Sequence, residues 1–352
     1  MAKDNSELPR LPKHGALVLP RVEVKSYNVE IEDTTGYVGD KASKSAFWEL
    51  LDKWRKPLKK FGEDPLGDKP SEEISKKKLA ELLIEGEPEA AGVVQSAVEE
   101  FAHELATVIR RFLRLKEWRD IECLVIGGGF RNSRIGELAI GRSAVLLKAD
   151  GIAIDLEPIR HHPDQAGLLG ATQLLPAWML KGYEAILAVD VGGTNIRAGI
   201  VELNLKKSRN LAKARVTKSL LWRHGDEDVT REQVVKSLVG MLDQLIGYAA
   251  KKKTAFAPII GIGCPGVIDE DGSIERGAQN LPGNWGSSRF NLPKSICEEI
   301  PKIGDHETMV VMHNDAVVQG LSERPFMEER ENWGVLTIGT GLGNASFANR
   351  EP

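Results

Sequence analysis

The stretch that decides the fold runs from residue 186 to residue 201 and reads Ile186-Leu-Ala-Val-Asp190-Val-Gly192-Gly193-Thr194-Asn195-Ile-Arg-Ala-Gly-Ile-Val201. It consists of an apolar run, a turn with two adjacent glycines, and a second apolar run. Two short apolar runs joined by such a turn predict a β-hairpin. Glycine lacks a Cβ atom, so the backbone N–H groups of the turn can approach phosphate oxygens closely. The stretch therefore predicts a phosphate-binding hairpin, and more than half of the chain precedes it.

The composition is that of an ordinary globular protein. The chain has 352 residues, of which 41% are hydrophobic and 28% charged, which is enough for two domains with real cores. A net charge of −4 gives no reason to expect nucleic acid or an acidic membrane as a partner. No apolar run approaches the ~20 residues of a membrane span. The 3 scattered cysteines suit a reducing cytoplasm and exclude a Cys-rich zinc cluster made by this chain.

Helical and strand patterns alternate along the chain. Apolar spacing predicts long helices over residues 94–112, 165–180 and 230–246. Short apolar runs predict strands at residues 15–25, 121–126, 152–156, 259–263, 308–312 and 333–338. Residues 52–90 mix both signs of charge with Pro and Gly, and predict a solvated surface excursion with a helix near 71–85. Helices that alternate with short buried strands indicate an α/β architecture.

Two further glycine-bearing turns also follow apolar strands, namely Gly127-Gly128-Gly129 and Gly339-Thr340-Gly341. Any one of these turns could be no more than a turn, but three in one chain indicate phosphate binding. Thr194 and Thr340 add hydroxyl donors. Asp190 directly follows its strand and could hold Mg²⁺ through water, because hard cations prefer oxygen ligands.

Two polar clusters complete the candidate site. Asn314 and Asp315 follow a strand and open a predicted helix. An Asp at such a place can accept the proton of a hydroxyl that attacks phosphorus, while either residue could instead cap the helix. Residues 277–285 are rich in turns and contain Asn284 and Trp285. Amides and an aromatic face suit a sugar, and they suit a structural loop equally well.

The motifs resemble, in this order along the chain, those of ROK-family sugar kinases, especially the glucokinase and polyphosphate-glucokinase-like members. These belong to the actin/hexokinase/Hsp70 ATPase superfamily. The resemblance is strong over residues 184–352 and rests on the segments at 190–195, 261–266, 280–285, 314–316 and 337–343. It implies a two-lobed α/β actin-like ATPase (ribonuclease H-like) fold, ATP and Mg²⁺ as cofactors, a small-molecule sugar as substrate and a homodimer as one assembly.

The family's later elements resemble the front of this chain. Residues 19–24 resemble the segment with the sugar-binding Glu, residues 86–129 the run into the adenosine motif, and residues 164–174 the closing helix. We therefore expect a circular permutation, with the family order 184–352 followed by 1–183. It predicts that the strand near 344–348 lies beside the strand near 16–22. The expected lobes are residues 1–163 plus 313–352, and residues 164–312.

The resemblance implies a role for each candidate residue. Asp315 is the general base of a sugar kinase, and Asp190 positions Mg²⁺ through water. The phosphate- and nucleotide-binding residues are Asp190, Gly192, Gly193, Thr194, Asn195, Thr340, Gly341, Gly127, Gly128 and Gly129. The sugar-binding residues are Asn284, Asn314, Asp315 and Glu23.

One departure concerns Glu23, which the family follows with a Gly-His pair and often with a zinc loop. Here Val24-Lys25-Ser26 follows and no Cys cluster comes after it, so we expect no structural zinc. Two alternatives to an ATP-dependent kinase stay open. One is a catalytically silent sugar- or nucleotide-binding regulator of the same fold, although residues 1–50 lack the helix-turn-helix of repressor relatives. The other is a polyphosphate-dependent glucokinase.

Overall fold

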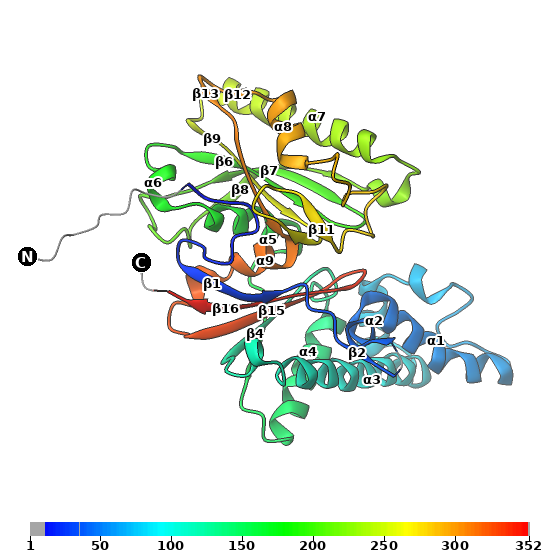
Figure 1. Ribbon diagram of the computed structural model, residues 1–352. Helices are drawn as coiled ribbons and strands as arrows, with labels where there is room; N and C mark the ends of the chain where they lie inside the picture. The colour runs from blue at the N-terminus through cyan, green and yellow to red at the C-terminus, as the bar shows by residue number, and fades with distance from the viewer. Residues whose placement is uncertain (1–10, 35, 351–352) are drawn as a thin grey trace, which may run out of the picture.

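Two five-stranded sheets form the two lobes of the protein, one above the other (Figure 1). The structure is a computed structural model that describes residues 11–34 and 36–350. The strand order is β14-β9-β6-β7-β8 in one sheet and β1-β16-β15-β4-β5 in the other. None of the helices within the described ranges combines the length and apolar character that a membrane crossing requires.

The upper sheet contains the predicted hairpin. Its strands are β6 (Ala185–Val191), β7 (Ile196–Glu202), β8 (Arg215–Trp222), β9 (Phe256–Cys264) and β14 (Met309–Asn314). β6 and β7 pair antiparallel around the turn, while β9 and β14 run parallel to β6. Helix α7 (Arg231–Lys252) begins with the capping box of Thr230 and Gln233 and, with α8 (Leu292–Glu299), covers one face of this sheet. The capping box satisfies two N–H groups that the helix itself leaves unpaired.

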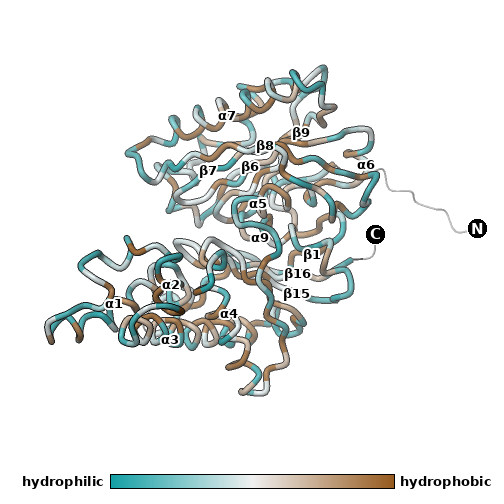
Figure 2. The backbone as a smooth tube through the Cα atoms, turned by 180° about the vertical axis from the view of Figure 1, so that it is seen from behind, coloured by the Kyte–Doolittle hydropathy of each residue, from teal (hydrophilic) through white to brown (hydrophobic). Residues whose placement is uncertain are grey.

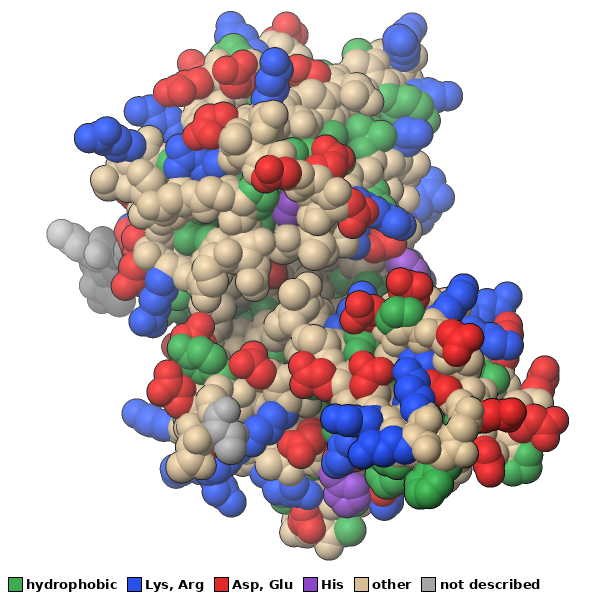
Figure 3. All heavy atoms as spheres, turned by 90° about the vertical axis from the view of Figure 1, so that its right-hand side faces the viewer, with side chains coloured by type: hydrophobic (Ala, Val, Ile, Leu, Met, Phe, Trp, Pro, Cys, Tyr) green, Lys and Arg blue, Asp and Glu red, His purple; other side chains and the backbone are tan. Residues whose placement is uncertain are grey.

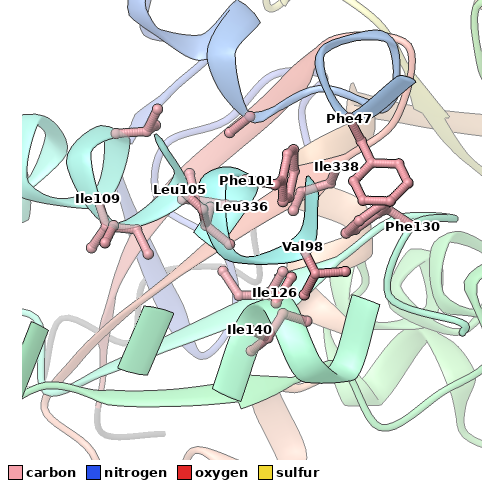
Figure 4. Packing of buried hydrophobic residues seen from close by; sticks show 14 of the residues in the cluster. Phe47, Val98, Phe101, Leu105, Ile109, Ile126, Phe130, Ile140, Leu336 and Ile338 are labelled. Atoms are coloured by element: carbon pink, nitrogen blue, oxygen red, sulfur yellow. The ribbon is translucent and has the colours of Figure 1, made fainter. Parts of the chain in front are cut away.

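The lower sheet combines both ends of the sequence. Its strands are β1 (Val22–Tyr27), β16 (Leu342–Asn349), β15 (Asn332–Ile338), β4 (Cys123–Gly127) and β5 (Asp155–Pro158). The long helices α3 (Pro88–Phe112) and α4 (Arg134–Ala149) cover its outer face. Phe101 and Leu105 of α3 pack against Ile126 and Leu336 of the sheet (Figure 4). Helices α1 (Lys44–Phe61) and α2 (Lys76–Glu85) extend this layer.

Two short helices join the lobes. α5 (Pro163–Gly170) and α9 (Asp315–Leu321) lie between the sheets, as the reverse view also shows (Figure 2). A Cβ on Gly170 would lie 1.7 Å from the carbonyl oxygen of Val318, so the two helices approach too closely for any other residue. Their apolar side chains share one buried cluster with residues of both sheets, for example Leu168, Val317 and Phe347. The lobes are therefore joined by a continuous core.

The remaining elements are short. They are β2 (Glu32–Asp33) with β3 (Gly36–Tyr37), β10 (Val267–Ile268) with β11 (Ile274–Arg276), β12 (Lys302–Ile303) with β13 (His306–Glu307), and α6 (Ala177–Leu180). The helix predicted over 165–180 is interrupted, since only α5 and α6 are α-helical and Pro176 precedes α6. A proline disfavours the helical conformation of the residue before it.

The prediction for residues 52–90 is confirmed in part. Most of the segment is exposed, and α2 (Lys76–Glu85) lies within the predicted helix at 71–85, but the start of the segment belongs to α1 and contains a buried anchor. The Arg55 side chain is fully buried and donates hydrogen bonds to Asp64, Ser71 and the carbonyl oxygens of Gly67 and Lys69. A buried guanidinium needs such a full set of partners. The charge pattern did not reveal it, because most other charges of the segment do face solvent.

The strand pairing that the permutation requires is present. β1 pairs antiparallel with β16, and Val24 lies opposite Phe347. The strand begins later than predicted, at Val22, because residues 17–24 form a turn in which the Val24 N–H donates to the carbonyl oxygen of Leu17. The permuted chain order itself stays a prediction.

Candidate active site

Three neighbouring parallel strands end at one edge of the upper sheet. In the register of β6 and β9, Asp190 lies opposite Gly263, and in that of β14 and β9, Asn314 lies opposite Cys264. Asp315 follows at once and begins α9. Ligands of open α/β sheets bind outside the carboxyl ends of such strands. The sequence thus brings Asp190 and Asp315, which are far apart in the chain, to the same edge.

The Asp315 carboxyl is surrounded by protein but keeps part of its surface accessible. Its Oδ1 accepts a hydrogen bond of 2.9 Å from the N–H of Ala316. Burial, and then the nearby Asp190 carboxylate, raise the pKa of Asp315 from its usual 3.8 to about 7. A carboxyl group with such a pKa exchanges its proton near neutral pH, which is what a general base requires.

The Asp190 carboxyl is held from two sides. It is 4% exposed, and Nη1 of Arg197 lies 3.4 Å from its Oδ2. Burial raises the pKa of Asp190, while the Arg197 cation opposes that rise. Arg197 also pairs at 2.6 Å with Asp164 of the closing helix α5. A Cβ on Gly167 of that helix would lie 2.7 Å from the Asp190 carboxyl carbon, so α5 packs directly on this side chain.

The predicted phosphate hairpin forms a tight and accessible turn. The Gly192 N–H donates to the carbonyl oxygen of Asn195 at 2.9 Å, and the Asn195 amide donates to the Thr194 hydroxyl at 3.1 Å. Thr194 is exposed and Gly193 is half-buried. His224, which is buried, donates from Nε2 to the carbonyl oxygen of Gly192 at 2.9 Å. Sequence reasoning missed His224, since a lone His in a loop gives no signal.

The other two glycine turns lie side by side in the lower sheet. β4 and β15 are parallel, and Thr337 lies opposite Gly127, so Gly127–Gly129 and Gly339–Gly341 come together where the strands end. Gly128 has φ +85°, and a Cβ there would lie 2.3 Å from the carbonyl oxygen of Ile338. Thr340 is exposed. The structure thus brings the second and third turns together as one surface.

These turns lie on the side of the molecule where the lobes separate. The turn that joins β15 to β16 lies at the upper edge of the lower lobe in Figure 1, near α2 and facing the upper lobe. The space-filling view of that side shows a hollow between the two lobes (Figure 3). A hollow of this kind between lobes is the usual place for a small-molecule site.

The sugar prediction for Asn314 is not supported. Asn314 is 1% exposed and is the N-cap of α9, because its Oδ1 accepts from the N–H groups of Ala316 and Val317. Its Nδ2 donates to the carbonyl oxygen of Gly266 at 3.0 Å. Of the two roles that the sequence left open, the structure gives Asn314 the cap.

The sugar prediction for Glu23 is also not supported. Val22 and Val24 point into the core beneath α9, so Glu23 between them faces the opposite side of the strand. Its carboxylate pairs with Lys25 at 3.1 Å and is 41% exposed. The role of Glu23 as a sugar ligand, and the effect of the departure that follows it in the sequence, stay predictions.

The loop at residues 277–285 does approach the phosphate hairpin. A Cβ on Gly193 would lie 3.1 Å from Cβ of Asn280. Trp285 is a structural anchor, because it is buried and its Nε1 donates to the carbonyl oxygen of Pro282 at 2.8 Å. Asn284 is exposed, and its backbone oxygen accepts a hydrogen bond from Arg231. Asn280, not Trp285, is the residue that this loop brings to the turn.

The site offers few protein ligands for a magnesium ion, which would then be bound mainly by waters and substrate phosphates. Within residues 11–34 and 36–350, no three His, Cys, Asp or Glu side chains are grouped to hold a metal ion. Mg²⁺ is commonly bound by one or two carboxylates, with waters and substrate phosphates as its other ligands. Asp190, with waters and substrate phosphates as the other ligands, matches that donor set.

Residues 186–352 match the model of the ROK family. These residues form a ROK family domain. The ROK family has the actin-like ATPase fold, and the two α/β lobes agree with it. The predicted family and fold class are confirmed for this part of the chain.

The ROK domain is similar to the glucokinase of Thermotoga maritima. The two chains are 31% identical over 160 residues, which are 45% of this chain and 43% of that protein. The match thus spans less than half the length of this relative.

Two solved structures overlap with this chain in part. A proposed sugar kinase from Cytophaga hutchinsonii is 21% identical with a TM-score of 0.35, over 47% of this chain and 48% of that one. The Lmo2764 protein from Listeria monocytogenes, a proposed N-acetylmannosamine kinase, is 23% identical with a TM-score of 0.33, over 47% of each chain.

Proposed function

We propose that the protein transfers a phosphoryl group from ATP to a hydroxyl of a sugar, with Asp315 as the general base. The observation that carries this proposal is the position of Asp315. It lies beside Asp190 at the edge where three strands end, and its pKa is raised to about 7. The ROK domain, and its similarity to a protein named glucokinase, make a hexose the first substrate to test.

The chemistry assigns one task to each group. The Asp315 carboxylate accepts the proton of the sugar hydroxyl, whose oxygen attacks the terminal phosphorus of ATP while ADP leaves. Gly192, Gly193 and Thr194 hold phosphate oxygens from the upper lobe, and Thr340 with Gly341 holds them from the lower lobe. Mg²⁺, when bound near Asp190 through water, neutralises phosphate charge. Closure of the lobes would exclude water from the transfer.

The sugar would lie between Asp315 and the loop at residues 277–285. Asn280 of that loop lies against Gly193, so its amide is the one best placed to reach a sugar hydroxyl near the phosphates. Asn284 remains a sugar ligand only if the loop turns it inward on binding. The three thiols are unpaired in the structure, which fits a cytoplasmic location where ATP is present.

The permuted chain order is part of the same proposal. It is supported by the antiparallel pairing of β1 with β16, which places the two ends of the described chain in one sheet. A chain rejoined in the order 184–352 followed by 1–183 should fold to the same thermal stability, within a few degrees. A rejoined chain that is insoluble or unfolded would contradict the permutation.

A coupled assay for ADP release with a panel of hexoses tests the activity. We expect turnover with at least one hexose and MgATP, and loss of that turnover in Asp315→Asn. The exposed Asp305→Asn serves as the matched control, because Asp305 lies in the β12–β13 hairpin. If a hexose raises the melting temperature but neither ATP nor polyphosphate supports turnover, the protein is a silent sugar-binding regulator and the proposal fails.

A further inference from the structure

Three cationic residues lie next to the two glycine turns of the lower lobe. Lys44 begins α1, and its backbone N–H donates to the carbonyl oxygen of Gly339 at 3.0 Å. Lys76 begins α2, and its ammonium group donates to the carbonyl oxygen of Gly129. Arg131 follows the Gly127–Gly129 turn within two residues. Elements from three separate parts of the chain thus bring positive charge to one place.

The packing beneath these groups is rigid. Phe130 is buried, and its ring centroid lies 5.1 Å from that of Phe47 in α1 and 4.7 Å from that of Phe101 in α3 (Figure 4). The Lys76 Nζ lies 6.0 Å from the centroid of Phe130. The aromatic cluster therefore fixes the start of α1 and the glycine turn relative to each other.

These cations are not neutralised by the protein. Among the described residues, no carboxylate forms an ion pair with Lys44, Lys76 or Arg131, and Nε of Arg131 is buried without a hydrogen-bond partner. Burial and the neighbouring Lys44 lower the pKa of Lys76, and no acid acts in the other direction. Other cationic side chains close to them in the sequence do form ion pairs with carboxylates.

Three neighbours show the contrast. Lys41 pairs with Asp33 at 3.0 Å, Lys77 with Glu81 at 3.9 Å, and Arg134 with Glu137 at 3.3 Å. Lys44 repels the Lys76 ammonium group, and an anion between the two would offset this repulsion. Phosphate oxygens suit this place, because each hydrogen bond between a cation and a phosphate is charge-assisted.

We propose that Lys44, Lys76 and Arg131 form a subsite for a phosphate group of the donor, beside the Gly127–Gly129 and Gly339–Gly341 turns. The subsite rests on the proposed function, since it names groups that bind the donor of that reaction. A phosphate there could belong to ATP or to an inorganic polyphosphate chain. Lys76 keeps two N–H donors for it after its bond to Gly129.

Calorimetric titration of the full chain with tripolyphosphate, and separately with MgATP, tests the subsite directly. Lys44→Gln is the decisive variant, because no hydrogen bond or ion pair of its side chain holds the described fold together. We expect its Kd to rise about tenfold for at least one of the two ligands. Its melting temperature without ligand should be unchanged or slightly higher, because a repulsion has been removed.

Two further variants separate binding from a structural role. Lys76→Gln should weaken ligand binding by a similar factor, whereas Lys76→Arg, which keeps the charge, should bind within about threefold of wild type. Lys78→Gln removes an exposed lysine from the same turn of α2 and is the matched control. A weakening for both ligands indicates a phosphate that they share, and a weakening for tripolyphosphate alone indicates a polyphosphate chain.

The two proposals can fail separately. If wild type binds neither ligand, or if Lys44→Gln binds both as tightly as wild type does, the subsite is refuted. If wild type binds tripolyphosphate or ATP in a manner that depends on Lys44, yet phosphorylates no sugar, the subsite stands and the proposed function fails.

Discussion

Replacement of Asp315 by Asn should make the protein more stable and inactive at the same time. The raised pKa means that the folded protein disfavours the ionised carboxylate. Asn has nearly the same shape, and its oxygen can still accept the hydrogen bond from the Ala316 N–H. It removes the charge that faces Asp190. A purely structural residue would not show a gain in stability together with a loss of activity.

The size of the gain follows from the pKa. A rise from 3.8 to about 7 corresponds to about 4 kcal/mol for a fully buried group. Asp315 is partly exposed, so solvent screening reduces this to about 2 kcal/mol. The unfolding entropy of a chain of 352 residues is roughly 0.7 kcal/mol per kelvin. The melting temperature should therefore rise by about 3 °C.

The gain depends on pH with a definite sign. The pKa of Asp315 is raised on folding, so the folded state binds more protons than the unfolded state between about pH 4 and about pH 7. Wild-type stability therefore falls as pH rises through this window. The Asp315→Asn variant has no ionisable group at this position, so its stability does not fall in this way as the pH rises. Its advantage over wild type should be small at pH 4 and complete at pH 8.

Differential scanning calorimetry at pH 4.5 and pH 8 measures the effect, and the coupled assay measures turnover. Loss of a general base typically lowers the rate 10²- to 10⁴-fold. The exposed Asp305→Asn should change neither quantity. The reasoning is refuted if Asp315→Asn keeps more than about a tenth of wild-type turnover, or if it melts below wild type at pH 8.

Three other predictions follow from the site. The kcat/KM of wild type should fall about tenfold per pH unit below about pH 7, because a protonated Asp315 accepts no proton. A flat kcat/KM profile from pH 5 to pH 8 would exclude Asp315 as the base. Asp190→Asn should raise the Mg²⁺ concentration for half-maximal turnover at least about tenfold in a metal titration, and an unchanged requirement would remove Asp190 from the metal site. Gly128→Ala should lower the free energy of unfolding by about 2 to 4 kcal/mol, because its φ is +85° and the new Cβ would lie 2.3 Å from the Ile338 oxygen. Gly129→Ala, with open space around the new Cβ, should cost less than about 1 kcal/mol in the same urea titration.

The backbone geometry of the glycine turns could be predicted from sequence because it depends on local residues, while their phosphate-binding role stays a prediction. A glycine pair after an apolar strand limits both the backbone conformation and the groups that can approach it. Gly128 shows this directly, since its φ is positive and a neighbouring strand leaves no room for a side chain. Gly192 forms the tight turn expected from its place between two strands. Such a motif needs no knowledge of the rest of the fold.

The sugar side could not be predicted in the same way. Asn314 and Trp285 carry polar and aromatic groups that suit a ligand, but each also meets a need of the fold. A helix of the length of α9 needs a cap at its start, and a buried indole needs an acceptor for its N–H group. The sequence alone does not show whether such a residue binds a ligand or has a structural role. The face on which Glu23 lies was not predictable for another reason, because the start of this edge strand depends on the turn that precedes it.

Arg55 shows a third kind of limit. Its segment has the composition of a solvated surface, and the side chain is nevertheless the anchor of a buried network. Its partners, Asp64 and Ser71, lie within the same segment. The average composition of a segment does not reveal that one of its charged residues is buried. The network joins the end of α1 to the residues just before α2, the helix that begins at Lys76.

The segment from His14 to Tyr27 links these observations, because it is bound to both lobes. Gly15 donates to the carbonyl oxygen of Met312 at 2.9 Å, and His313 donates to that of Ala16 at 3.2 Å, so the segment lies along β14 just before Asp315. It then crosses to the lower sheet and pairs with β16 as β1. Closure of the lobes must therefore either carry this segment along or break its bonds to β14. Since Asp315 directly follows β14, we expect these bonds to limit how far the proposed base moves toward the glycine turns when the lobes close.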